Sequence, residues 1–468
     1  MAANETQFSI VRSSRGEDEL SDRWTGAAGL AVAAIALGYC ISIEGGGLRR
    51  ETVLALTFSL VAAMAAASIG SLWSVEKLGD RPTVFLLAIG MVFQVGQLLI
   101  DPVGVDLGDS KVIGPFSFAL VAATLLAGSN LSEQRWLGRL QVPLLLLAHV
   151  ALGAWILQTS SIPDSAVHSV QRNAADALLH GRTPYELSFP ELKGRGFPYP
   201  PLTLMLDALG QAIAGDHRYA QLLAITISGA LMAYARPGRV GAIAAALFLF
   251  TPRMFLVLQQ GWTETFLVLA LSASVWCACR RPKIFPFALG MLFALKAYLV
   301  LGLPAASLML RRPFKRKDVL NLSLKAIGTA LVVTFPLAAW APAAFLRSVG
   351  TLELDPTFKP EPLSYLAYFA REGGLQFPSA VAYVAAAFAA ALALWRAPRT
   401  AAGFSAALAL TFGAFFAFHP AATFNHYFLV VGALCCSIAA TGLPGTMSDV
   451  EEMKAMSMVT RIGEASPK

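Results

Sequence analysis

Ionisable side chains interrupt the apolar stretches of this sequence at a few positions, and these residues could do chemistry. Lys296 lies alone in one apolar stretch, His426 begins another, and Arg253 and Trp262 stand in the polar stretch before Glu264. An ionisable group at membrane depth is costly, so it generally has a function. A carboxylate can bind hydroxyl groups, and a cation can stabilise an anion. The structural alternatives are a lysine that snorkels to the interface and a hydrogen-bonded interfacial histidine.

A long polar segment, residues 160–218, carries further candidates. Apolar residues recur there at helical spacing over 165–180, so we expect an amphipathic helix on the membrane surface. Asp164 stands at the expected N-cap, and His168 and Arg172 follow one and two turns later on one face. Asp164 is therefore either a helix cap or a fixed carboxylate that can act as a base.

The end of this segment reads Phe-Pro-Tyr-Pro-Pro over residues 197–201. The adjacent prolines favour an extended entry into the next helix, and Tyr199 would be an aromatic residue at the membrane interface. Residues 201–215 are too short for a full span and contain Asp207. We expect them to form a half-buried surface helix.

The composition is that of an integral membrane protein. Apolar residues make up 56% of the 468 residues and charged residues 14%, against roughly 25% charged in soluble domains. A soluble domain could not cover that much apolar surface. The net charge of +7 is spread over short loops. This pattern indicates contact with membrane lipids and gives no reason to infer nucleic acid.

Apolar runs near the length that crosses a bilayer, about 20 residues, recur along the chain. The fold class that they predict is an all-α polytopic membrane protein with about 14 transmembrane or half-membrane helices, including an amphipathic juxtamembrane helix in the first long outer loop. Residues 285–310 are interpreted as two short helices with Lys296 at the turn. The other predicted spans are 24–43, 52–75, 83–100, 115–128, 140–159, 219–235, 240–257, 263–279, 326–345, 376–395, 401–418 and 425–443.

Short loops rich in lysine and arginine predict the orientation. Basic loops such as 236–239 and 311–317 are placed inside, which puts both termini in the cytoplasm and segment 160–218 on the outer side. The unusual polar groups then gather at the outer face. We therefore predict an integral, multi-pass protein of a bacterial inner (plasma) membrane. Its site would face the periplasm or exterior.

The order of these motifs resembles the GT-C integral-membrane glycosyltransferases, and most closely the polyprenol-phosphate-mannose-dependent branch, glycosyltransferase family 87. The likeness rests on the outer-loop Asp164, a helix ending in Leu-Leu-His-Gly-Arg-Thr-Pro-Tyr, and the Tyr-Pro-Pro element. Gly-Trp-Thr-Glu264, Ala-Leu-Lys296 and Asn-His426-Tyr stand where that branch has its later motifs. The resemblance covers roughly residues 140–443. It divides the chain into four parts: a cytoplasmic tail (1–23), extra N-terminal transmembrane helices (24–139), a GT-C-like catalytic membrane domain (140–443) and a C-terminal cytoplasmic tail (444–468).

The resemblance implies inverting transfer of a sugar, mannose or a similar hexose, from a polyprenyl-phosphate donor to a lipid or glycan acceptor. Asp164 would be the catalytic base. The expected donor-phosphate ligands are Lys296, Arg253, His426 and Arg172. The expected sugar or acceptor ligands are Glu264, Tyr199, His168 and Trp262. No Asp-x-Asp occurs in 160–218 and no glycine-rich phosphate loop follows a strand, so we expect no metal, nucleotide or other cofactor.

Two other classes of protein remain open at this point. A transporter or flippase for a lipid-linked sugar would use similar interfacial cations, but transporters usually place polar groups near the bilayer midplane. A non-catalytic scaffold would use segment 160–218 as a partner-binding surface. That alternative gives Lys296 and Glu264 no role.

Overall fold

The computed structural model describes residues 30, 32–40, 50–68, 89, 92, 135–159, 165–235, 239–251, 254–310, 315–351 and 362–441. Among these residues the chain is helical, and its one β-type pairing is an isolated bridge between Phe189 and Arg195. Asp164, Arg253, the predicted span 115–128 and both predicted tails lie outside the described residues.

Between Arg135 and Thr351 of the described residues, most helices follow one another through short connections, apart from the segment between α6 and α7. The first part of the chain contributes α2 (Arg50–Ser68), α5 (Arg135–Thr159), α6 (Ala166–Leu179), η2 (Pro184–Glu186), η3 (Pro190–Leu192), α7 (Pro201–Ala214) and α8 (Arg218–Ala235). The middle contributes α9 (Arg239–Leu249), α10 (Met254–Gln259), α11 (Glu264–Arg280), α12 (Phe285–Phe293), η4 (Ala297–Gly302), α13 (Leu303–Ala306) and η5 (Ser307–Met309). The last part contributes α14 (Arg316–Trp340), α15 (Pro342–Thr351), α16 (Tyr365–Gly373), α17 (Ala380–Arg396), α18 (Ala401–Phe418) and α19 (Phe424–Ala440).

Three helical stretches among the described residues are long and apolar enough to cross a membrane. They are Leu140–Thr159 in α5, Arg316–Trp340 and Ala401–Phe418. The predicted helical membrane protein is confirmed at this coarse level, and the count of about 14 helices stays a prediction. The predicted span 401–418 coincides with α18.

Two predicted spans differ from the structure. The expected single helix over 240–257 is wrong, because α9 ends at Leu249 and α10 begins at Met254. Pro252 lies in that gap and has no backbone N–H to continue a helix. The single span expected over 326–345 is also wrong, because α14 begins ten residues earlier, at Arg316, and ends at Trp340, and Pro342 begins α15.

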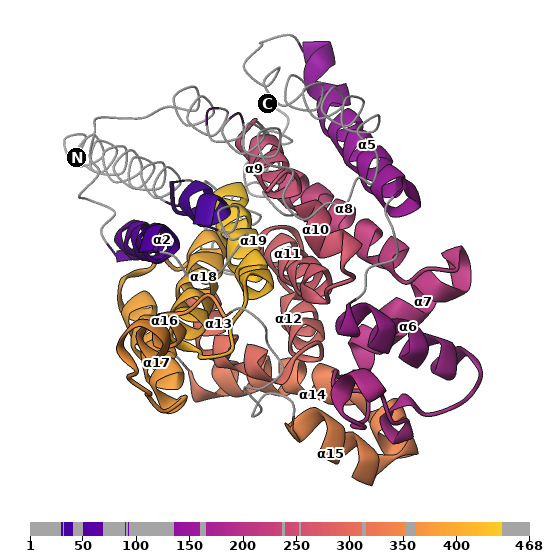
Figure 1. The fold of residues 1–468 in the computed structure, drawn as a ribbon. Helices are drawn as coiled ribbons and strands as arrows, with labels where there is room; N and C mark the ends of the chain where they lie inside the picture. The colour runs from indigo at the N-terminus through magenta and orange to yellow at the C-terminus, as the bar shows by residue number, and fades with distance from the viewer. Residues whose placement is uncertain are drawn as a thin grey trace, which may run out of the picture.

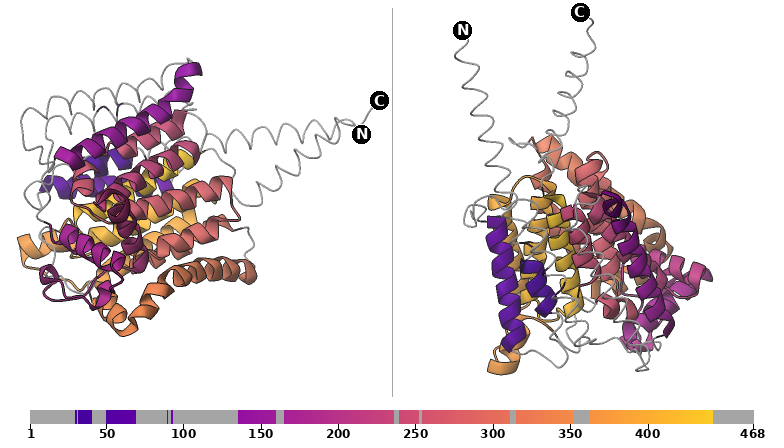
Figure 2. Two further views of the ribbon diagram at one scale, coloured as in Figure 1. Left: turned by 90° about the vertical axis from the view of Figure 1, so that its right-hand side faces the viewer. Right: turned by 90° about the horizontal axis from the view of Figure 1, so that it is seen from above.

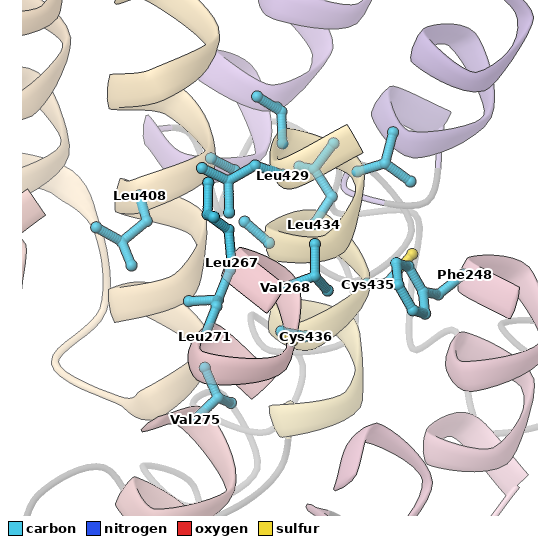
Figure 3. Close-up of a cluster of buried hydrophobic side chains, with 14 of the residues drawn as sticks. Phe248, Leu267, Val268, Leu271, Val275, Leu408, Leu429, Leu434, Cys435 and Cys436 are labelled. Carbon is cyan, nitrogen blue, oxygen red and sulfur yellow. The ribbon is translucent and has the colours of Figure 1, made fainter. Parts of the chain in front are cut away.

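The core lies where α9, α11, α18 and α19 meet, near the centre of Figure 1. Leu267 and Val268 of α11 pack there with Leu429 of α19 and Phe248 of α9 (Figure 3). In α18, 89% of the apolar window is buried, against 11% in α14. The outer helix α14 therefore presents apolar side chains, such as Phe335, to its surroundings, as a lipid-facing helix does.

Helix α6 confirms the predicted amphipathic helix, and its buried face includes Val170, Ala174 and Ala177. This face packs on η2, η3 and α7. The aromatic residue Phe197 lies in the same apolar cluster, together with Ala344 of α15. In the left view of Figure 2, α6 and α15 lie at one end of the bundle.

Candidate functional site

The predicted site residues Lys296 and Glu264 form a buried ion pair. The Nζ of Lys296 lies 2.7 Å from Oε1 of Glu264, and the two side chains are 11% and 2% exposed. Glu264 is the first residue of α11, and Lys296 occupies an extended break (φ −152°, ψ 140°) between α12 and η4. The predicted break in this stretch is confirmed at Lys296, and its predicted position near the outer face stays a prediction. Lys296 is paired inside the protein instead of snorkelling to the surface.

Aromatic rings surround this pair. The Nζ of Lys296 lies 5.7 Å from the ring centroid of Tyr199 and 5.8 Å from that of Tyr298, both within cation–π range. Trp262 packs edge-on against Phe424, at 4.8 Å between centroids. Tyr199 is fixed in part by its backbone, whose carbonyl accepts a hydrogen bond from the Tyr185 hydroxyl. The surroundings are therefore apolar and aromatic, which strengthens electrostatic interactions within them.

The start of α19 closes the site from another side. The Asn425 side chain lies beside the Glu264 carboxylate. His426 forms a capping box with Thr423, in which Nδ1 accepts from the Thr423 backbone N–H at 3.2 Å. Its ring lies 5.1 Å from that of Phe416. His426 thus caps a helix at the site, and its predicted contact with phosphate stays a prediction.

An apolar groove of about 790 Å³ begins beside the ion pair. Ala297 and Tyr298, the two residues after Lys296, line it together with further residues up to Leu310, and α14, α17 and α18 form the other walls. The lining residues Val300, Val319 and Tyr383 are exposed at the outer surface of the bundle. A long apolar chain could therefore enter from the lipid and reach the Tyr298 ring, whose centroid lies 5.8 Å from the Nζ of Lys296.

A second group of polar side chains is buried around Gly261, and we call it the histidine cluster: His168, Gln171, His217, Gln221 and Gly261. The imidazole rings of His168 and His217 lie 4.8 Å apart. A Cβ added to Gly261, whose φ is +72°, would lie 2.8 Å from Nε2 of His217 and 3.5 Å from Nδ1 of His168. The turn between α10 and α11 therefore packs directly against both imidazoles.

The histidine cluster carries no paired charges of its own, and it holds its imidazoles neutral. Burial lowers the pKa of His168 to about 4, with a further contribution from the Arg218 cation. Burial also lowers the pKa of His217 to about 3, helped by the proximity of His168 and opposed by Asp216. Among the described residues, Nδ1 of His168 and both ring nitrogens of His217 have no hydrogen-bond partner.

The predicted site residues thus fall into two groups. The first group lies at the ion pair and consists of Lys296, Glu264, Tyr199 and Trp262. His426, near the start of α19, belongs to the same group. His168 belongs to the histidine cluster, and Arg172 is exposed although it lies one turn later on the same helix.

The expectation that Asp164 occupies the N-cap of this helix is wrong. The N-cap of α6 is Ser165, one residue later, and α6 begins at Ala166. Asp164 and Arg253 themselves lie outside the described residues.

Sequence reasoning missed several buried polar residues, namely Asp207, His217, Arg218 and Gln221. Asp207 served only as the reason to expect a half-buried helix over 201–215, and its side chain is fully buried. The exposed face of α7 instead carries apolar residues such as Leu209 and Ile213. For Asp207 the useful signal would have been the one applied to Lys296, an ionisable residue inside an apolar run.

Among the described residues, no group of three or more histidine, cysteine or acidic side chains could hold a metal ion. The chain matches no family model, no curated protein and no solved structure. The fold and the buried polar groups therefore define a helical membrane protein with a charged, groove-linked site at one end of its bundle.

Proposed function

We propose that the protein is an integral-membrane glycosyltransferase that moves a sugar from a polyprenyl-phosphate donor to a lipid or glycan acceptor. The observation that supports this most is the apolar groove that begins beside the buried Lys296. The polyprenyl chain occupies the groove and the donor phosphate lies at the ammonium. The aromatic rings of Tyr199 and Trp262 pack against the sugar, and Glu264 accepts hydrogen bonds from its hydroxyls.

The proposed reaction inverts the anomeric carbon. The acceptor oxygen forms a bond to that carbon, the bond from the carbon to the phosphate oxygen breaks, and the base takes the acceptor's hydroxyl proton. Asp164 is the proposed base. Lys296 stabilises the negative charge on the departing lipid phosphate in surroundings of low dielectric. Arg253, Arg172 and His426 are the further proposed phosphate ligands, and His168 a further acceptor ligand.

The proposed setting is a bacterial inner membrane, and the basic-loop pattern supports placing the site at its outer face. A transporter for a lipid-linked sugar is the second candidate. One observation favours it, because the helix is broken at Lys296 and broken helices are typical of transporter binding sites. Release of free lipid phosphate distinguishes the two, since a transporter leaves the sugar–phosphate bond intact.

A groove-filling variant tests the proposed donor. Ala387 lines the groove and is exposed within it, whereas Val384 is exposed on α17 outside the lining. We expect Ala387→Phe to raise the KM for a polyprenyl-phosphate sugar about tenfold or more, because the phenyl ring takes the space of the lipid chain. Val384→Phe is the matched control and should keep the wild-type KM. A wild-type protein that releases no lipid phosphate from any of several polyprenyl-phosphate sugars would contradict the proposal.

Asp164→Asn tests the proposed base. Asparagine keeps the size and polarity of the side chain but cannot take a proton at neutral pH. General-base catalysis contributes about 10²–10⁴-fold, so we expect kcat to fall by that factor while thermal stability and donor binding persist. Transfer rates of the purified variant, measured beside its unfolding temperature, check this. A variant that keeps more than about a tenth of the wild-type rate would exclude Asp164 as the base.

A further inference from the structure

Two polar side chains of α8 bond to the backbone of the turn that leads into Glu264. Nε2 of Gln221 donates to the carbonyl oxygen of Gly261 at 2.9 Å. Nη1 of Arg218 donates to the carbonyl oxygen of Gln259 at 3.2 Å. Glu264 follows Gly261 by three residues, so α8 fixes the turn at two points just before the site carboxylate.

Both side chains are themselves held in place. Asp216 accepts from Nε of Arg218 at 2.9 Å and from Nη2 at 2.7 Å, a forked geometry that fixes the guanidinium. Nε2 of Gln221 also lies 3.4 Å from Oδ1 of Asp207. Gln221 is fully buried and Arg218 nearly so. Because few rotamers satisfy all these contacts, the turn has little freedom to move relative to α8.

Gly261 limits the turn from its other side. Its left-handed backbone (φ +72°) and its contact with the imidazole of His217 leave no room for a side chain. Neither Arg218 nor Gln221 lines the apolar groove. They are therefore well placed to act on the site through the turn alone.

We propose that Arg218 and Gln221 are positioning residues that hold the Glu264 carboxylate against Lys296. The inference rests on the proposed function only for its effect on catalysis, because the ion pair can be measured without any substrate. If the turn loosens, Glu264 moves away from the ammonium. Lys296 then becomes more reactive towards reagents. The sugar of the donor loses a ligand for its hydroxyl groups, whereas the lipid chain of the donor still binds in the apolar groove.

The experiment measures the rate at which a small amine-acylating reagent modifies Lys296 in the purified, folded protein, by mass spectrometry. Gln221→Met keeps the length of the side chain but cannot donate a hydrogen bond. We expect labelling of Lys296 to rise about tenfold, as in Glu264→Gln, because the side-chain nitrogen loses the charge-assisted hydrogen bond that occupies it. Gln211→Met is the matched control on α7 and should label at the wild-type rate. If Gln221→Met does not fold, Arg218→Lys replaces it, since lysine keeps the charge but loses the fork.

A double variant separates positioning from general loosening. If Gln221 acts through Glu264, Gln221→Met should change labelling less than about twofold in the Glu264→Gln background, because effects on one pathway are not additive. An equal increase in both backgrounds, or wild-type labelling in Gln221→Met, would overturn the proposal. In an active enzyme the same variant should raise donor KM while inhibition by sugar-free polyprenyl phosphate persists. Absence of sugar transfer by the wild type would contradict the proposed function alone, and the labelling result would still decide the positioning role.

Discussion

The ion pair and the histidine cluster lie on either side of the same turn, between α10 and α11, yet they are stabilised in different ways. At the ion pair, Glu264 and Lys296 carry full charges 2.7 Å apart. In the histidine cluster, His168 and His217 are buried as neutral imidazoles against Gly261. Burial is costly for a charge, so a charge needs a partner, whereas a titratable group can lose its charge instead.

This difference separates their roles. The ion pair lies beside the groove and can exchange its internal partner for a ligand, because a phosphate can compete with Glu264 for the ammonium. The histidine cluster is buried between α6, α8 and the turn, and His217 is fully buried. Its side chains are suited to fix the turn, and the ion pair is suited to bind.

Removing one member of the ion pair should have the largest effect on stability. Lys296→Met leaves the Glu264 carboxylate buried without its cation, and breaking a buried pair costs about 3–5 kcal/mol. We expect the free energy of unfolding to fall by that amount, as measured by denaturant unfolding in detergent. The double variant Lys296→Met/Glu264→Met should be more stable than the single variant, because no unpaired charge remains.

A single and a double variant of equal stability would show that the pair is not electrostatically coupled. In that case the contrast with the histidine cluster would disappear, since both groups would then behave as ordinary buried polar residues. Activity cannot replace stability here, because both variants also remove proposed ligands of the substrate.

The contrast also explains what could be predicted from the sequence. Lys296 and Glu264 were found because charged residues in apolar runs are conspicuous, and the break at Lys296 followed from the basic loops on both sides. Their partnership was not predicted, because 32 residues separate them and the helix packing that joins them is a tertiary property.

Of the histidine cluster, only His168 was predicted as a site residue, and Gln171, His217 and Gln221 were missed because they carry no conspicuous charge. Neutral glutamine and histidine side chains look like ordinary polar residues until the fold buries them. Gln221 lies in an apolar helix and His217 in a connection, and neither position indicates burial. The helix boundaries show a similar limit: α18 was predicted because its apolar run has clear ends, whereas Pro252 divides a run that hydropathy alone treats as continuous.

Acid should affect the histidine cluster at mildly acidic pH. The ordinary pKa of histidine is near 6.5, whereas the pKa values of His168 and His217 are about 4 and about 3 in the folded protein. Arg172 and Arg218 disfavour the charged imidazoles, and Asp216 only partly offsets them. Between about pH 6.5 and pH 4 the unfolded chain therefore binds more protons than the folded protein. Stability is fully present above about pH 6.5 and is lost as the pH falls through this window.

The measurement is the unfolding temperature at about pH 7 and about pH 5. The lower value is chosen to leave Asp216 ionised, because the Arg218 hydrogen bonds outweigh burial and hold the pKa of its carboxyl below its ordinary value. We expect the unfolding temperature of the wild type to fall between the two pH values, and the fall to shrink in His217→Gln, whose side chain does not titrate. His180 is exposed at the end of α6, so His180→Gln is the matched control and should keep the full wild-type dependence. An equal fall in wild type and His217→Gln would mean that His217 does not limit stability in acid, and the turn would then depend on the hydrogen bonds of Arg218 and Gln221 alone.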